Sequence, residues 1–256
     1  MSALSIHMFP CLADNYGYLL HDAASGMTAA VDTPDADEIL AQLAAKGWRL
    51  THIFNTHHHA DHAGGNLQLK SATGCTIVGP GADAARIPGI DVAVGEGDFV
   101  ALGAHRAAVF DTPGHTRGHI VYYFADAHAA FVGDTLFALG CGRLFEGTPR
   151  QMWRSLQKIL EWPDDTRIYC AHEYTQSNAR FALTVEPHNR QLRERAEAVA
   201  RLRAAGTPTV PSTLGEERAT NPFLRPQSAD LRATIELRGA PDVDVFAKTR
   251  ALKDAF

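Results

Sequence analysis

The sequence predicts an α+β protein in which two sets of strands precede a helical C-terminal segment. Short apolar runs of β type fill residues 4–31, and a strand–helix–strand pattern follows up to residue 78. A second group of closely spaced strands, separated by turn signals, lies between Val92 and Phe131. From about Tyr174 the composition favours helices.

The N-terminal elements follow from local signals. Turns are expected at Asp22-Ala23 and Ser25-Gly26. A helix is predicted to start at Thr33-Pro34-Asp35 and to run to about Lys46, because proline and acidic residues suit a first turn. Gly47 ends it. The following elements are a buried strand at His52–Asn55, a helix at Asn66–Thr73 and a strand at Thr76–Val78.

Later elements are shorter or more polar. Strands are expected around residues 99–102, 106–110, 119–124, 129–132 and 167–170, and helices at 150–160, 191–205, 228–237 and 243–253. We place a domain boundary near residue 173, so that residues 1–173 form one domain and residues 174–256 a second. The break at 207–212 is an alternative linker, but about 45 residues beyond it would make a marginal domain.

Composition indicates an ordinary globular protein of 256 residues with a net charge of −5. Residues 1–173 carry 11 basic and 19 acidic side chains, which suits cation binding and disfavours nucleic acid. No secretory signal or membrane-spanning stretch is recognisable. The four widely spaced cysteines argue for reduced thiols. We therefore expect a cytoplasmic monomer without a membrane or nucleic-acid partner.

The segment Thr56–Gly65 holds five side chains that can bind metal within six residues, which is hard to explain as a solvated loop. In an extended chain, side chains two apart point the same way, so His57 and His59 can meet one ion. Asp61 and His62 follow on a turn and can reach a second point. Glycines at 64 and 65 allow close backbone packing there.

Three later strands end in further ligand-type residues. His115 follows the apolar strand that ends near Phe110, Asp134 follows Phe131-Val132-Gly133, and His172 follows Ile168-Tyr169-Cys170. Strand ends gather distant side chains on a rigid scaffold. Imidazole and carboxylate ligands without thiolate suit zinc, and also iron or manganese. Seven candidates are too many for one tetrahedral ion and the right number for two.

These motifs resemble the metallo-β-lactamase superfamily, and more closely glyoxalase II, the hydroxyacylglutathione hydrolases. The T-H-x-H-x-D-H run carries the superfamily likeness. The finer likeness rests on four strings: L-A-D-N-Y at 12–16, C-G-R-L-F-E-G at 141–147, H-E-Y-T at 172–175 and N-P-F-L-R at 221–225. The resemblance covers nearly the whole chain. It implies a four-layer αββα sandwich with a C-terminal helical domain that binds substrate.

The resemblance also implies a ligand set. His57, His59 and His115 would hold one ion, Asp61, His62 and His172 the other, and Asp134 would bridge both. Two ions about 3.5–4 Å apart can share a water that ionises near neutral pH. The implied reaction is attack of this hydroxide on the thioester of S-D-lactoylglutathione, which gives glutathione and D-lactate in methylglyoxal detoxification. No separate acid or base is expected, because a thiolate leaves readily.

Glutathione contacts are also taken from the resemblance. The matching positions hold Arg143, Phe145, Tyr174, Arg250 and Lys253. Some relatives have Lys and Tyr at the first two positions. Arg143 keeps the charge, whereas Phe145 lacks the hydroxyl and thus one hydrogen bond of about 1 kcal/mol. The alternative for Arg250 and Lys253 is a solvated helix face.

Other polar residues have simpler interpretations. His58 alternates away from the metal and is expected to pack or to support a ligand, while His119 is a candidate for orienting one. Asp32 ends an apolar strand and is a candidate for a hydrogen bond near the metal loop. Six further histidines have no motif partner: His7, His21, His52, His105, His128 and His188.

Other functions stay open at this point. A glutathione-linked persulfide dioxygenase of the same superfamily would use one iron and oxygen, but the helical tail and N-P-F-L-R argue against it. A metal-free binding protein would not need a complete ligand set. The metal motif alone would also allow a lactonase or β-lactamase.

Overall fold

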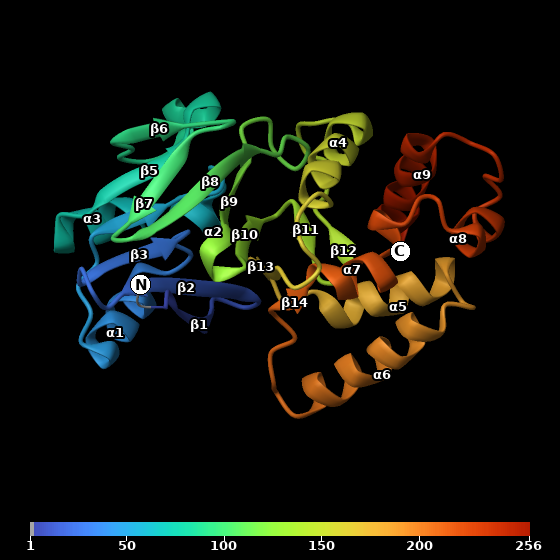
Figure 1. Cartoon of the computed structure of the whole chain (residues 1–256), viewed down its shortest axis with the longest axis horizontal. Coiled ribbons are helices and arrows are strands. Elements are labelled where there is room, and N and C mark those ends of the chain that lie inside the picture. The colour runs from blue at the N-terminus through green and yellow to red at the C-terminus, as the bar shows by residue number, and fades with distance from the viewer. Residues whose placement is uncertain (1–2) are drawn as a thin grey trace. The chain divides into compact units, whose positions relative to one another are not determined.

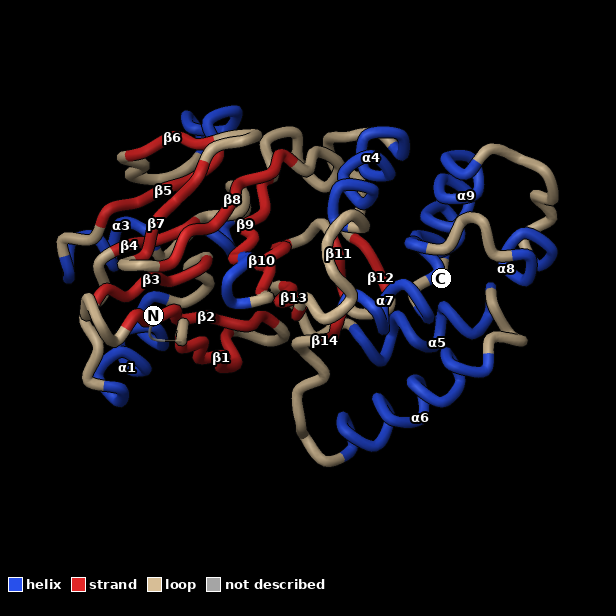
Figure 2. Tube along the Cα trace, viewed as in Figure 1, coloured by secondary structure: helices blue, strands red, loops and turns tan. Residues whose placement is uncertain are grey.

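The structure is a computed structural model that describes residues 3–256, and the chain forms two compact units. Among the described residues, unit 1 comprises residues 3–111 and Arg117–Gly133, and unit 2 comprises Thr112–Thr116 and Asp134–Phe256. Figure 1 labels their elements, and Figure 2 colours the same trace by secondary structure. Unit 1 holds most of the strands, and unit 2 most of the helices.

The first sheet of unit 1 follows chain order. Its strands are β1 (Ser5–Cys11), β2 (Asn15–Asp22), β3 (Met27–Val31), β4 (His52–Phe54), β5 (Thr76–Pro80) and β6 (Val92–Val94). The first three pair antiparallel, and β3 to β6 pair parallel. The sequence placed Val92 at the start of the second strand group, which was wrong: β6 pairs with β5 in the first sheet.

Helices α1 (Ala36–Lys46) and α3 (Asn66–Thr73) make the parallel crossovers and cover one face of this sheet. Ile39 of α1 and Leu69 of α3 pack with Ile53 and Ile77 of the sheet in one buried core. The first helix begins three residues later than predicted, because the Asp35 side chain caps it by accepting from the backbone N–H groups of residues 37 and 38.

The second sheet of unit 1 is antiparallel. Its strands are β7 (Phe99–Leu102), β8 (His105–Asp111), β9 (Ile120–Phe124) and β10 (Ala129–Gly133). Its inner face packs on the first sheet, where Phe54 contacts Tyr122 with ring centroids 5.4 Å apart. The Tyr122 hydroxyl donates to the Asn55 carbonyl at 2.9 Å. A core between two sheets thus supports the loops that leave β4, β8 and β10.

Unit 2 contains the antiparallel strand pair β13 (Arg167–Cys170) and β14 (Ser212–Thr213), and a hairpin of β11 (Leu136–Phe137) and β12 (Gly140–Cys141). Its helices are α4 (Pro149–Ile159), α5 (Thr175–Val185), α6 (Arg190–Ala204), α7 (Leu214–Thr220), α8 (Ala229–Thr234) and α9 (Asp242–Ala255). The predicted helix at 228–237 is shorter, ending at Thr234. Among the described residues, no helix is long and apolar enough to cross a membrane.

Candidate metal centre

The segment after β4 gathers four ligand-type side chains within unit 1. His57 and His59 lie before the short helix α2 (Ala60–Ala63), and Asp61 and His62 lie on it. Nε2 of His57 lies 3.1 Å from Nδ1 of His59. Nε2 of His62 lies 3.4 Å from Oδ2 of Asp61. The loop therefore presents two separate pairs of ligand atoms.

Three further ligand-type residues lie together within unit 2. His115 follows β8, Asp134 follows β10 and His172 follows β13. Oδ2 of Asp134 lies 3.3 Å from Nε2 of His115, and Oδ1 lies 3.4 Å from Nε2 of His172. Each carboxylate oxygen thus faces a different histidine, which is the geometry required of a carboxylate between two ions.

All four pairs have the spacing of two ligands on one ion. A zinc–nitrogen bond measures about 2.0–2.1 Å, so two ligands of a tetrahedral site lie about 3.3–3.4 Å apart. The four observed separations run from 3.1 to 3.4 Å. Five of the seven residues are also at most 6% exposed: His57, His62, His115, Asp134 and His172.

The chemistry of these donors fits a divalent metal. Imidazole nitrogen and carboxylate oxygen are ligands of zinc, iron and manganese. The four cysteines are free and buried. Burial raises the pKa of the Cys11 and Cys170 thiols to about 12, and that of Cys141 to about 11, so they stay protonated near neutral pH. These thiols therefore do not provide thiolate ligands near neutral pH.

Asp32 orients the ligand loop. It lies at the end of β3 with a positive φ of 58°, a conformation that a short acidic side chain tolerates. Its carboxylate accepts hydrogen bonds from the backbone and hydroxyl of Thr56 at 2.7 and 2.8 Å. It also lies 2.8 Å from Nδ1 of His62, which leaves Nε2 of that ring for a metal. The predicted hydrogen bond near the metal loop is confirmed.

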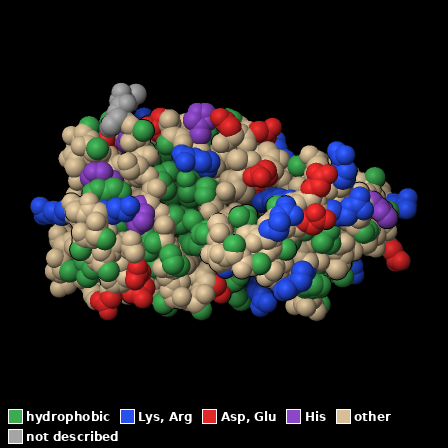
Figure 3. Space-filling view, turned by 90° about the horizontal axis from the view of Figure 1, so that it is seen from below, with side chains coloured by type: hydrophobic (Ala, Val, Ile, Leu, Met, Phe, Trp, Pro, Cys, Tyr) green, Lys and Arg blue, Asp and Glu red, His purple; other side chains and the backbone are tan. Residues whose placement is uncertain are grey.

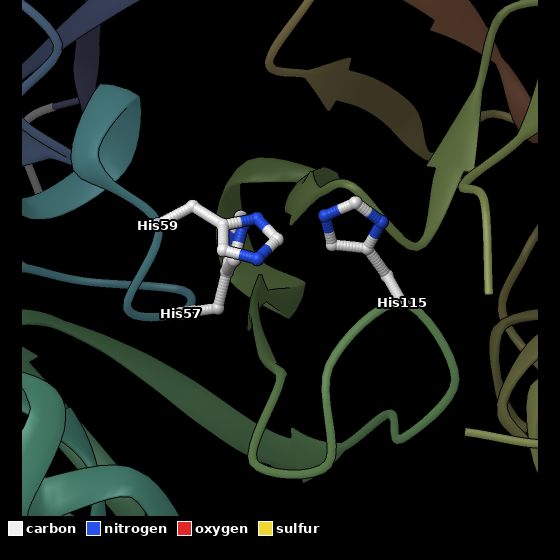
Figure 4. Close-up of side chains that lie close together, drawn as sticks. All are labelled: His57, His59 and His115. Carbon is white, nitrogen blue, oxygen red and sulfur yellow. The ribbon is translucent and has the colours of Figure 1, made fainter. Parts of the chain in front are cut away.

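Two other rings are held through Nδ1 in the same way. Nδ1 of His57 lies 3.1 Å from the Thr56 hydroxyl, and Nδ1 of His115 lies 2.9 Å from the carbonyl oxygen of Arg143. In Figure 4, His57 and His59 extend from the loop that leads into α2, and His115 extends from the loop after β8. Such partners fix a ring before any metal arrives.

Two histidines outside the proposed ligand set, His58 and His119, contact residues of the ligand loop or its surroundings in different ways. Nδ1 of His58 lies 3.3 Å from the buried carboxylate of Asp83, in agreement with its predicted supporting role. His119 is buried and stacks on His57 with ring centroids 4.8 Å apart. The contribution of Asp83 was missed, because its sequence neighbourhood carries no ligand pattern.

Two of the expected substrate contacts are exposed aromatic residues beside metal-ligand candidates of unit 2. Phe145 is 63% exposed and meets the ring of His115 at 5.2 Å between centroids. Tyr174 is 37% exposed and stacks on His172 at 4.8 Å with an interplanar angle of 1°. An exposed Phe and Tyr next to polar rings form an amphipathic surface suited to a small organic ligand.

The three basic residues expected to contact glutathione differ in how far they are exposed to solvent. Arg143 is exposed, whereas Arg250 is only 4% exposed and donates to the Cys141 carbonyl and to Asp254, both at 2.8 Å. Lys253 is half-buried and bonds Ser177 of α5. Burial lowers the pKa of Lys253, and the charges of Arg250, Arg180 and Arg143 lower it further. Arg250 therefore does not lie on a solvated face. Sequence analysis did not single out Arg180, whose charge also acts on Lys253.

The remaining charge of unit 2 is largely solvated. Figure 3 shows basic and acidic side chains intermingled on the surface over its helices. On α6 the exposed charged residues have both signs: Arg190, Arg193, Glu194, Glu197 and Arg201. These arginines therefore lie on a solvated helix face.

Two protein families match consecutive parts of the chain. The metallo-beta-lactamase superfamily matches residues 17–172, and the hydroxyacylglutathione hydrolase C-terminus matches residues 173–256. Solved structures agree on the fold. ETHE1 from Myxococcus xanthus is 26% identical with a TM-score of 0.67, over 98% of this chain and 100% of that one. A Staphylococcus aureus metallo-beta-lactamase, 22% identical over 99% of this chain and 72% of that one, has a TM-score of 0.68. The chain is a metallo-β-lactamase-fold protein.

Curated relatives narrow the class. A hydroxyacylglutathione hydrolase of Methylococcus capsulatus is 58% identical over 253 residues, which cover 99% of each chain. One of Maricaulis maris is 56% identical over 256 residues and 100% of each chain. The chain belongs to the hydroxyacylglutathione hydrolases, a family of hydrolytic enzymes. The α+β fold class and the family resemblance read from the sequence are thereby confirmed.

Proposed function

We propose that the enzyme hydrolyses the thioester of an S-2-hydroxyacylglutathione at a centre of two divalent metal ions. For S-D-lactoylglutathione, water adds to the acyl carbon, the carbon–sulfur bond breaks, and glutathione and D-lactate leave. This is the second step of methylglyoxal detoxification. The observation that carries the proposal is the Asp134 carboxylate, whose two oxygens face His115 and His172 separately. The substrate class is supported by the names of the full-length relatives.

We assign His57, His59 and His115 to one ion, and Asp61, His62 and His172 to the other, with Asp134 between them. Zinc is the proposed metal, and iron or manganese would suit the same donors.

Such a metal pair supplies a water of near-neutral pKa and a positive charge for the oxyanion that forms on the acyl group. The protein prepares this chemistry with oriented side chains. Asp32 and Arg143 hold the rings of His62 and His115 through Nδ1. No further acid is needed, because a thiolate is a fair leaving group.

The helical part would bind the glutathione moiety. Phe145 and Tyr174 offer apolar faces beside the ligand histidines, while Arg143 and Lys253 offer positive charge to carboxylates. Arg250 adds its buried charge beside Lys253 and holds the Cys141 carbonyl. We accordingly propose a catalytic domain at 1–173 and a substrate-binding domain at 174–256.

The proposal describes a cytoplasmic monomer that binds no nucleic acid. The free thiols support a reducing compartment, and the acidic residues 1–173 disfavour a nucleic-acid partner. Sedimentation at several protein concentrations would test the monomer.

The first experiment measures metal content per chain and hydrolysis of S-D-lactoylglutathione on the same preparation. About two ions and rapid loss of the thioester would support the proposal. One iron with oxygen uptake and no hydrolysis would instead assign the protein to the glutathione-linked persulfide dioxygenases. A folded, metal-free protein that binds glutathione would point to a binding role.

A further inference from the structure

Side chains of the helical elements form hydrogen bonds with the backbone of the hairpin β11–β12 of unit 2 at its turn. The amide of Asn178 on α5 donates to the Ala138 carbonyl at 3.1 Å. The carboxylate of Glu217 on α7 accepts from the backbone N–H of Leu139 at 2.9 Å. Leu139 has a φ of 58°, a left-handed conformation that a leucine adopts only when its surroundings hold it there.

Asn221, which directly follows α7, completes the grip. Its Nδ2 donates to the carbonyls of Phe137 and Gly140 at 3.2 and 3.0 Å, and lies 3.0 Å from Oε2 of Glu217. The side chains that bond the four consecutive residues 137–140 therefore come from Asn178, Glu217 and Asn221. We call these three residues the hairpin clamp.

The clamp is buried and its charge is neutralised. Glu217 and Asn221 are 0% exposed, and Asn178 is 5% exposed. Arg195 of α6 forms an ion pair with Glu217 and also donates to Thr220 at 2.6 Å. Because buried polar groups are costly when unpaired, removal of one clamp residue leaves hairpin backbone groups without a partner.

The segment that follows the hairpin lies against the proposed ligands Asp134 and His115. A side chain at Gly142 would place its Cβ 2.0 Å from the Asp134 carbonyl oxygen and 3.3 Å from Cβ of His115. The backbone N–H of Gly142 donates to the Thr135 carbonyl at 3.3 Å. The next residue, Arg143, offers the carbonyl that lies 2.9 Å from Nδ1 of His115. A shift of the hairpin would therefore move the partner that orients His115.

We propose that Asn178, Glu217 and Asn221 are positioning residues for the metal centre. They act through the hairpin, because the residues that follow it, Gly142 and Arg143, pack against Asp134 and orient His115. The inference rests on the proposed metal centre, and it assigns to Asn221, the first residue of the N-P-F-L-R string, a role that the substrate contacts do not explain.

The test uses Asn221→Ala, which removes two bonds to the hairpin, and Asn178→Ala, which removes one. The matched control is Asn189→Ala, since Asn189 caps α6 and bonds Ala219 but does not touch the hairpin. Zinc affinity is measured by competition with a chelator, together with amide hydrogen exchange of residues 136–143. Both clamp variants should bind zinc roughly 10-fold or more weakly, as loss of an outer partner of a ligand does, with the larger loss in Asn221→Ala. The control should lose thermal stability only.

Equal zinc affinity in a folded Asn221→Ala and in the wild type would overturn the proposal. If Asn221→Ala does not fold, the milder Asn178→Ala decides in the same way. A purely structural role would lower the melting temperature of the clamp variants and the control alike and leave zinc affinity unchanged. Because zinc binding is measured without substrate, failure of the thioester hydrolysis would contradict the proposed reaction and leave this test intact.

Discussion

Oδ2 of Asp32 lies 2.8 Å from Nδ1 of His62, so a carboxylate at the end of β3 directs the other nitrogen of that ring toward the ligand loop. The same carboxylate accepts the Thr56 N–H and hydroxyl. One side chain outside the ligand motif therefore fixes both the start of the loop and one of its rings.

Asp32→Asn should lower zinc affinity and kcat/KM by roughly 10–100-fold, because the uncharged amide is a weaker acceptor for the ring. Asparagine tolerates the left-handed backbone at this position, so the fold should persist. Chelator competition and steady-state kinetics measure the effect. Asp37→Asn, on the exposed first turn of α1, is the matched control. Unchanged zinc affinity in Asp32→Asn would remove Asp32 from the metal site.

Asp134→Ala should abolish one of the two metal sites, because both carboxylate oxygens face ligand histidines. We expect metal content to fall from about two ions to one or fewer, and hydrolysis to fall by more than the roughly 10–100-fold typical of outer partners. Metal analysis and thioester hydrolysis on one preparation check this. A variant that keeps two ions and full activity would show that Asp134 does not bridge.

Phe145→Tyr should lower KM for S-D-lactoylglutathione. The ring is 63% exposed beside His115, and the added hydroxyl can bond glutathione. One hydrogen bond of about 1 kcal/mol corresponds to roughly a fivefold change in KM, with little change in kcat. Phe99→Tyr, at a half-exposed position on β7, is the control. An unchanged KM in Phe145→Tyr counts against the contact.

As pH is raised, KM for S-D-lactoylglutathione should begin to increase at a lower pH than it would if Lys253 had the pKa of an ordinary lysine. The pKa of Lys253 is lowered, first by burial and then by neighbouring arginines, so its positive charge is lost below the usual value of 10.5 as pH rises. Binding of a carboxylate by this group is therefore strong below the lowered pKa and weak above it. Lys253→Arg should keep KM flat to higher pH, since arginine stays charged. The exposed Lys248→Met is expected to leave the pH profile unchanged, and an unshifted profile in Lys253→Arg would contradict the assignment.

Much of the fold could be predicted because its signals are local. The helix at Asn66–Thr73 and the strands at 99–102 and 167–170 have the predicted bounds, since periodicity and turn residues mark both ends. The strand β6 was misassigned because three residues carry no mark of the sheet they join. The hairpin β11–β12 was not foreseen, since the side chains that hold its turn come from residues 178, 217 and 221.

The sequence by itself determined the family, the candidate ligands and the kind of ion they suit, because donor type and spacing are properties of the residues themselves. Only the tertiary structure decided how these residues are held. That Asp32 orients His62, that Arg250 is buried against Cys141, and that Asn221 bonds the hairpin all depend on contacts between distant segments. Such contacts follow from packing in three dimensions, and no local pattern in the chain encodes them.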